Sequence, residues 1–117
     1  MPRTVLIVDD HPSFRATARA LLESEGFDVV GEAVDGFDAI AKAEELRPDV
    51  VLLDVQLPGL DGFEVSSRLC ANGSSPAIVL VSSRDASDYG SLILSCGARG
   101  FVPKAELSGA AIRALLA

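Results

Sequence analysis

The sequence is poor in aromatic side chains, which make up 5% of its 117 residues and include no tryptophan. Since 49% of the residues are hydrophobic, aliphatic side chains such as Val, Leu, Ile and Ala must fill the core instead. Such side chains suit buried parallel strands that are covered by helices. A chain of this length buries roughly two-thirds of its unfolded surface on folding, so we expect one domain over residues 1–117.

Positive charge is also scarce, because ten Lys and Arg residues face 17 Asp and Glu residues, for a net charge of −7. Tight binding to nucleic acid or to an anionic membrane needs a basic surface. We therefore expect this chain to bind neither DNA nor a membrane directly. The sequence shows no charged-then-apolar leader and no apolar run near the roughly 18 residues that span a bilayer, so we expect a cytoplasmic location.

Cysteine and histidine are rare. The two cysteines, Cys70 and Cys96, form no CxxC pair and no Cys/His cluster, so we expect small buried apolar side chains in a reducing compartment. The one histidine, His11, stands beside two carboxylates. We interpret it as a neighbour of a helix start and assign it no catalytic role.

Apolar runs and helical stretches alternate along the whole chain. The apolar runs predict strands over residues 5–8, 28–33, 50–53, 77–81 and 101–102. Helices are expected between them and at the end, and we expect the fourth, over 85–96, to be the loosest because Gly90 and several serines lower its helix propensity. Five such units predict an α/β, flavodoxin-like (CheY-like) (βα)5 three-layer sandwich with a parallel sheet in the order 2-1-3-4-5.

The predicted strands end in charged or hydroxyl-bearing side chains. In such a sheet a ligand binds beyond the carboxyl ends of the strands, where the strand order reverses between the first and third. The side chains at these ends belong to Asp9, Asp10, Asp54, Ser82 and Lys104. Three crowded carboxylates require a cation or raised pKa values. Mg²⁺ suits this edge, because it prefers a few carboxylates together with water and phosphate oxygens.

These side-chain types favour phosphoryl transfer. A free oxygen of Asp54 can attack phosphorus to form an acyl phosphate, a known use of carboxylate nucleophiles. Mg²⁺ and the Lys104 ammonium would neutralise phosphoryl oxygens, and the Ser82 hydroxyl could donate a hydrogen bond to one of them. The neighbouring Ser83 competes for that last role. Taken singly, Asp9 and Asp10 would also suit a helix cap, and Ser82 a turn.

Four segments at these strand ends resemble bacterial two-component response-regulator receiver domains. They are VLIVDDH at 5–11, DVVLLDVQLPGLDG at 49–62, AIVLVSS at 77–83 and GFVPKA at 100–105. The likeness covers essentially the whole chain, and the sequence looks most like receivers that precede a helix-turn-helix output domain of the NarL/FixJ/LuxR type.

The resemblance implies a role for each matching residue. Asp54 is the expected phosphoacceptor, loaded by a sensor histidine kinase, and Lys104 is expected to bind the phosphoryl group. The Mg²⁺ ligands that it implies are Asp9, Asp10, Asp54 and the backbone carbonyl of Gln56. Ser82 and Phe101 match the switch hydroxyl and the switch aromatic, which in the family move together and alter the face of the fourth helix, fifth strand and fifth helix. A core anchor is an equally good interpretation of Phe101.

Three positions differ from the family pattern or vary within it. Ala105 follows Lys104 where many receivers have proline, so we expect the cis peptide bond common there to be absent and the role of the lysine to survive. Gln56 and Arg84 stand two residues after the acceptor and two after the switch hydroxyl. We hypothesise that their bulk shields the phosphoryl group from water.

Several functions remain open at this stage. The leading one is a phosphoacceptor signalling domain that regulates transcription through a DNA-binding domain absent from this chain. It would be an enzyme only toward its own phosphorylation and dephosphorylation, and a homodimer is left open. The alternatives are a stand-alone receiver or phosphorelay protein, a degenerate receiver without phosphorylation, and a small aspartyl-phosphate phosphatase. The phosphatase is disfavoured because Asp9 and Asp10 are adjacent, rather than in a DxD pattern, and because no insertion is long enough for a cap.

Overall fold

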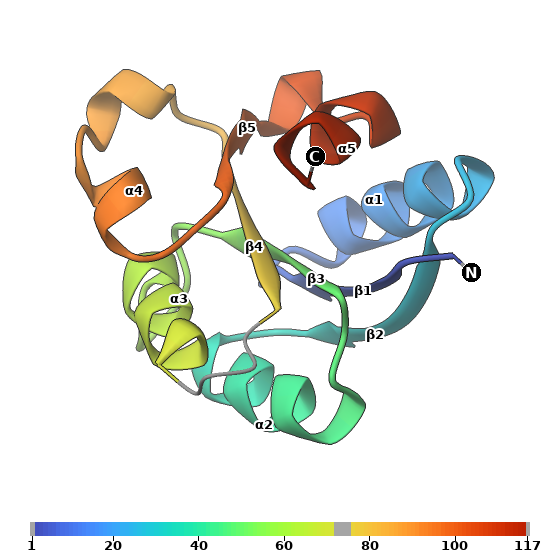
Figure 1. The fold of residues 1–117 in the computed structure, drawn as a ribbon, viewed down its shortest axis with the longest axis horizontal. Coiled ribbons are helices and arrows are strands. Elements are labelled where there is room, and N and C mark those ends of the chain that lie inside the picture. Colours follow the sequence, from blue (N-terminus) through green and yellow to red (C-terminus); the bar gives the residue numbers. More distant parts are fainter. Residues whose placement is uncertain (1, 72–75, 117) are drawn as a thin grey trace.

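A computed structural model describes residues 2–71 and 76–116, so the ends of the predicted domain, residues 1 and 117, lie outside it. Five parallel strands form one sheet in the order β2-β1-β3-β4-β5 (Figure 1). The strands are β1 (Thr4–Val8), β2 (Asp28–Ala33), β3 (Val50–Asp54), β4 (Ala77–Ser82) and β5 (Gly100–Pro103). The helices are α1 (Pro12–Ser24), α2 (Gly36–Leu46), α3 (Gly62–Cys70), α4 (Leu92–Ser95) and α5 (Gly109–Leu116). The predicted α/β class and strand order are confirmed.

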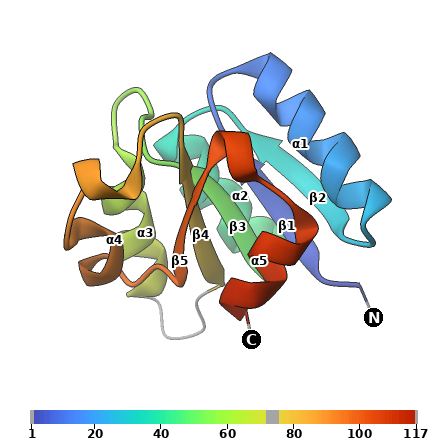
Figure 2. The same cartoon turned by 90° about the horizontal axis from the view of Figure 1, so that it is seen from above.

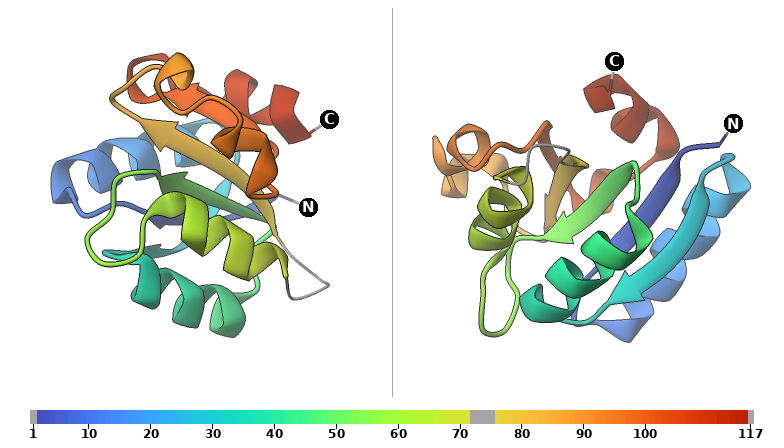
Figure 3. Two further views of the ribbon diagram at one scale, coloured as in Figure 1. Left: turned by 90° about the vertical axis from the view of Figure 1, so that its left-hand side faces the viewer. Right: turned by 60° about the horizontal axis from the view of Figure 1, so that its bottom comes forward.

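Helices cover both faces of the sheet because successive strand residues point to opposite sides. In β1, Val5 and Ile7 belong to one buried cluster, which α1 and α5 complete, whereas Leu6 and Val8 belong to the other, which α2 and α3 complete. Figures 2 and 3 show this division into three layers from further directions. Every residue of β3 is buried, as its unbroken apolar run predicted.

The segment between β4 and β5 differs from the prediction. We predicted one helix over 85–96, but the structure has a 3-10 turn at Ala86–Asp88 and then α4, which has four residues and no buried one. Gly90 lies between them with φ +56°, a left-handed conformation that interrupts a helix and that glycine adopts at little cost. The prediction of a single long helix was therefore wrong, although the low helix propensity of this segment agrees with its division at Gly90.

Two expectations from composition have different outcomes. Cys96 is buried, at 5% exposure, as predicted. Cys70 is only partly buried, with its thiol 3.5 Å from the Gly97 carbonyl oxygen, so the predicted burial of this side chain was wrong. The longest helix, α1, has 13 residues, and within the described ranges no helix has the length and apolar character needed to cross a membrane.

Candidate functional site

The three predicted carboxylates gather at the carboxyl edge of the sheet, where β1 and β3 are neighbours. Asp9 follows β1 and is fully buried, Asp54 ends β3 and is 2% exposed, and Asp10 lies at the exposed rim. One ligand atom from each of these residues and from His11 lies within 4.8 Å of the others. The sheet thus brings together the acidic groups that the sequence placed at separate strand ends.

Asp54 has a different partner on each of its oxygens. The backbone N–H of Gln56 donates to Asp54 Oδ1 at 3.1 Å, and Lys104 Nζ lies 3.6 Å from Asp54 Oδ2. Burial raises the pKa of the Asp54 carboxyl to about 6, and the negative charge of Asp9 adds to the increase, whereas the Gln56 hydrogen bond and Lys104 oppose it. The carboxylate therefore sits where added positive charge would be strongly favourable.

Close approach of α3 helps to shape the loop after Asp54. Gly62 begins α3, and a Cβ atom there would lie 2.5 Å from the Asp54 carbonyl oxygen. The Gly62 N–H donates to the Val55 carbonyl at 2.9 Å, and the Asp61 side chain caps α3 by accepting from the Glu64 N–H at 2.9 Å. Only glycine fits at position 62 without moving the backbone that carries Asp54.

Asp9 presents one oxygen to the chain and one to the interior of the acidic cluster. Its Oδ1 accepts from the backbone N–H of His11 at 2.8 Å and contacts the His11 ring nitrogen Nδ1 at 2.9 Å. Its Oδ2 is buried and has no hydrogen bond of good geometry within the described part of the chain, its close contact being the Lys104 ammonium at 2.6 Å. A buried carboxylate oxygen in this state has capacity for a cation.

His11 lies at the start of α1, as predicted, and is itself the N-cap residue, so neither Asp9 nor Asp10 caps that helix. The ring nitrogen Nδ1 also lies 3.1 Å from Asp10 Oδ1. The structure thus places the imidazole in contact with both carboxylates.

Lys104 reaches the acidic cluster from the end of β5. Its ammonium lies near Asp9 and Asp54, and it stands 4.4 Å from the centroid of the Phe14 ring, which comes from α1. The cation–π contact adds a second attraction that holds the lysine over the cluster. The peptide bond between Lys104 and Ala105 is trans, as the missing proline predicted.

Ser82 is fully buried at the end of β4, whereas the competing Ser83 is exposed. The backbone N–H of Arg84 donates to Ser82 Oγ at 3.1 Å, and the Tyr89 hydroxyl lies 2.8 Å from the same oxygen. The predicted switch aromatic, Phe101, is partly buried on β5, with its ring centroid 5.7 Å from that of Tyr89. Sequence reasoning missed Tyr89, although it is the single tyrosine of the chain.

Arg15 is a second residue that sequence reasoning missed. Its Nη1 donates to the Asp9 carbonyl at 2.7 Å, and its Nε pairs with Glu32 Oε1 at 3.0 Å. Arg19, one turn further along α1, pairs with Glu32 Oε2 at 2.8 Å. Hydrogen bonds from Arg19 and then Arg15 lower the pKa of the Glu32 carboxyl. The i,i+4 spacing of the two arginines was the signal that could have found this cluster.

Gln56 and Arg84 have exposed side chains near the ends of β3 and β4. The Gln56 N–H contacts Asp54, but the ligand role predicted for the Gln56 carbonyl remains a prediction, as does the shielding by both side chains.

An acidic cluster with one lysine, at the point where a parallel sheet reverses its strand order, defines a class of doubly wound α/β domains with a charged site. The model of the response regulator receiver domain family matches residues 5–116, and the chain belongs to that family.

Among curated relatives, the chain is 42% identical over 106 residues to the virulence-factor transcription regulator BvgA of Bordetella pertussis, covering 91% of this chain and 51% of BvgA. It is 37% identical over 101 residues to the DNA-binding transcriptional activator EvgA of Escherichia coli K12, covering 86% of this chain and 50% of EvgA. The chain therefore spans about half the length of these relatives.

Solved structures show the same fold. The signal receiver domain of the response regulator NarL from Mycobacterium tuberculosis is 34% identical, with a TM-score of 0.86 and coverage of 98% of this chain and 97% of that one. CheY from Borrelia burgdorferi, in a complex with CheX, BeF3 and Mg, is 27% identical, with a TM-score of 0.86 and coverage of 99% and 87%. The fold that carries the acidic edge is thus shared over 97% of the NarL receiver chain.

Proposed function

We propose that residues 1–117 form a receiver domain that accepts a phosphoryl group on Asp54 from a sensor histidine kinase in a Mg²⁺-dependent reaction. The observation that carries this proposal is the buried carboxylate pair of Asp9 and Asp54, with Lys104 beside both. The similarity to BvgA and EvgA supports a role in transcription regulation, through a DNA-binding part outside this chain.

The residues at the edge fit a magnesium ion. All the proposed ligands, Asp9, Asp10, Asp54 and the Gln56 carbonyl, offer the hard oxygen atoms that Mg²⁺ prefers. Asp9 Oδ2 is buried without a hydrogen bond of good geometry, and the pKa of Asp54 is raised, so both carboxylates would gain from a cation. When bound, Mg²⁺ would supply positive charge to the phosphoryl oxygens. The CheY relative that was solved with Mg and BeF3 supports this assignment.

The chain's own residues orient and charge the nucleophile. A carboxylate oxygen of Asp54 attacks phosphorus, so that an O–P bond forms while the P–N bond of a kinase phosphohistidine breaks. The electron pair of that P–N bond passes to the imidazole nitrogen of the kinase. The Gln56 N–H fixes the Asp54 carboxylate, and the Lys104 ammonium lies where negative phosphoryl oxygens would gather. With a pKa of about 6, Asp54 is mostly ionised at neutral pH.

The remaining parts of the proposal concern the response to phosphorylation. The Ser82 hydroxyl would donate to a phosphoryl oxygen, and the Ser82 and Phe101 region would transmit the change to an output surface or to a second copy of the chain. The exposed Gln56 and Arg84 side chains would slow hydrolysis by keeping water from the acyl phosphate. The domain would act in the cytoplasm, where a kinase could reach it, and would catalyse only its own phosphorylation and dephosphorylation.

The test is phosphorylation by acetyl phosphate with Mg²⁺, followed by intact-mass measurement. We expect one phosphoryl adduct on the wild type, none without Mg²⁺, and none on Asp54→Asn. The matched control is Asp28→Asn. It changes an exposed aspartate at the first residue of β2, away from the carboxyl ends of the strands, and should keep the adduct. Multiple turnover of a phosphorylated metabolite would support the phosphatase instead, and an adduct that persists in Asp54→Asn would refute the assigned acceptor.

A further inference from the structure

The contact between Ser82 and Tyr89 joins the end of β4 to the segment that precedes α4. Ser82 Oγ already accepts from the Arg84 N–H, and it lies 2.8 Å from the Tyr89 hydroxyl. A serine hydroxyl has one proton and two lone pairs. If Tyr89 donates, Ser82 accepts from both Arg84 and Tyr89 and its proton stays free, whereas if Ser82 donates to Tyr89, a new acceptor for that proton displaces Tyr89.

The ring of Tyr89 lies between two other aromatic rings. Its centroid is 5.4 Å from that of Phe63 on α3, in an edge-to-face arrangement, and 5.7 Å from that of Phe101 on β5. Such geometries are attractive beyond the area that they bury. One side chain thus connects the segment before α4 to β4, to α3 and to β5.

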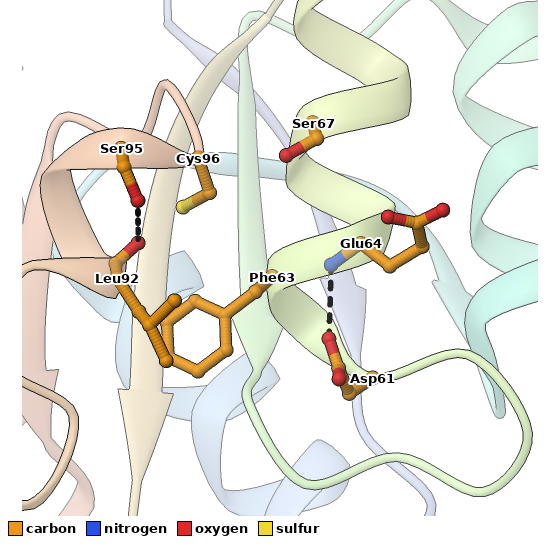
Figure 4. Close-up of a pocket in the computed structure, with 7 residues that line it drawn as sticks. All are labelled: Asp61, Phe63, Glu64, Ser67, Leu92, Ser95 and Cys96. Carbon is orange, nitrogen blue, oxygen red and sulfur yellow. Dashed lines mark hydrogen bonds between the residues drawn. The ribbon is translucent and has the colours of Figure 1, made fainter.

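Cys96 anchors the end of this segment, since it is buried and its carbonyl accepts from Ser66 Oγ at 2.9 Å, but the part between Tyr89 and Cys96 packs loosely. Helix α4 has no buried residue, and Leu92 and Leu94 are 51% and 75% exposed. Figure 4 shows a hollow between α3 and α4, lined in part by Phe63, Leu92 and Cys96. The layer between the two helices is therefore incompletely filled, which leaves room for the segment to move.

We propose that Tyr89 is the positioning residue that fastens residues 85–96 to Ser82 while Asp54 is unphosphorylated, and that phosphorylation of Asp54 loosens this attachment. The inference rests on the proposed function, and it adds a residue to the predicted switch pair. Phe101 has no hydroxyl and cannot bond to Ser82, whereas Tyr89 has one and does so. In the arrangement we propose, Ser82 donates to the Tyr89 hydroxyl, so Tyr89 loses that proton as a hydrogen-bond partner when Ser82 donates to a phosphoryl oxygen instead, and residues 85–96 are held less firmly.

The chain carries its own reporter for this event. Tyr89 is the single tyrosine and the sequence has no tryptophan, so the tyrosine emission comes from this one side chain. We expect the emission to change when acetyl phosphate and Mg²⁺ phosphorylate the wild type. On the same samples, hydrogen exchange of residues 85–96 should become about fivefold faster, the factor expected from the loss of one ordinary hydrogen bond.

Four variants separate the hydroxyl contact from simple packing. Tyr89→Phe should show the faster exchange before phosphorylation and little further change after it. Phe63→Leu removes a ring that contacts Tyr89 but leaves the Tyr89 hydroxyl in place, so this variant should still respond to phosphorylation. Ser82→Thr keeps the hydroxyl and should also retain the response, in contrast to Ser82→Ala when molecules with equal adduct are compared.

The adduct mass measured on each sample distinguishes the two levels of failure. If the wild type forms the adduct but its tyrosine emission and exchange stay constant, the role of Tyr89 is overturned and the proposed function stands. If hydrogen exchange in Tyr89→Phe responds to phosphorylation as in the wild type, the Tyr89 hydroxyl does not attach residues 85–96 to Ser82, and the inference is likewise overturned. If no adduct forms with any donor, the proposed function fails and the inference fails with it.

Discussion

The two flanks of the acidic edge are held by different kinds of contact. On the α1 flank, Glu32 accepts from Arg15 and Arg19, and Arg15 also donates to the Asp9 carbonyl, all between 2.7 and 3.0 Å. On the α4 flank, the Tyr89 hydroxyl and ring join residues 85–96 to β4 and β5, Cys96 anchors the end of the segment in the core, and α4 itself has no buried residue. Charged hydrogen bonds are typically stronger than neutral ones.

This difference indicates which flank can change its structure when the charge at the acidic edge changes. Local opening is least costly where few apolar contacts are buried, and most costly in core strands. The α1 flank holds the backbone of Asp9 in place, so the charged site keeps its geometry. The α4 flank has little to lose on moving, so it is the flank where a new charge on Asp54 can produce a structural response.

The largest expected effect contrasts the core beneath the site with the α4 flank. Leu53→Ala removes a fully buried side chain next to Asp54 and should lower the free energy of unfolding by about 2–5 kcal/mol. Leu94→Ala changes a side chain that is 75% exposed and should stay within about 0.5 kcal/mol of the wild type. Urea unfolding measures both, and a comparable loss in Leu94→Ala would show that the α4 flank is as firmly packed as the core.

A second prediction concerns the negative charge of Asp54, which lies between the two flanks. The pKa of Asp54 is raised from 3.8 to about 6, so the folded state binds a proton on this carboxyl more tightly than the unfolded state does. Between these values the native state binds more protons than the unfolded state, and stability falls as the pH rises. Asp54→Asn cannot ionise and should stabilise the metal-free protein at pH 7 by about 1–3 kcal/mol.

Urea unfolding of Asp54→Asn without Mg²⁺ at pH 7 and pH 4 checks this sign. The gain should shrink at pH 4, where the wild-type carboxyl is mostly protonated, and it should also shrink when Mg²⁺ binds the wild type. An equal gain at both pH values would contradict a raised pKa. Asp61→Asn, at an exposed position that caps α3, is the control for the same substitution outside the buried cluster.

The sheet and the acidic edge were predictable from sequence, because the apolar runs at 5–8 and 50–53 are followed directly by aspartates. The break in the fourth helix was not, since Gly90 lowers helix propensity without stating which conformation replaces the helix. Tyr89 escaped notice because its ring partners, Phe63 and Phe101, are distant in sequence. The spacing of Arg15 and Arg19 could have indicated their pairing with Glu32, but not the bond from Arg15 to the Asp9 backbone carbonyl, because no pattern of side chains identifies such a partner.

The third prediction asks whether the α1 flank positions the proposed metal ligands. Arg15→Ala removes the hydrogen bond to the Asp9 carbonyl and should weaken Mg²⁺ binding about tenfold, a typical effect of groups that orient metal ligands. Arg19→Ala is the matched control, because Arg19 pairs with the same Glu32 but donates to the Val29 carbonyl instead. Calorimetric titration with Mg²⁺ measures both. Equal losses would show that the general charge of α1 matters and the Asp9 contact does not.

The smallest expected effect tests the ionic attachment of the α1 flank itself. Two arginines lower the pKa of Glu32, so its contribution to stability is present above its ordinary pKa of 4.5 and is lost as the pH falls through the lowered value. The side chain is 30% exposed, and solvent screening limits the expected cost of Glu32→Gln at pH 7 to about 1 kcal/mol.

The control is Glu23→Gln. Glu23 is half exposed and pairs with Arg19 alone, at 3.5 Å, so its replacement should cost less. Thermal unfolding at pH 7 and at pH 3 measures the difference, which should shrink at the lower pH. A cost of Glu32→Gln that is the same at pH 3 as at pH 7 would mean that packing, and not charge, holds the α1 flank, and the contrast between the two flanks would then lose its electrostatic basis.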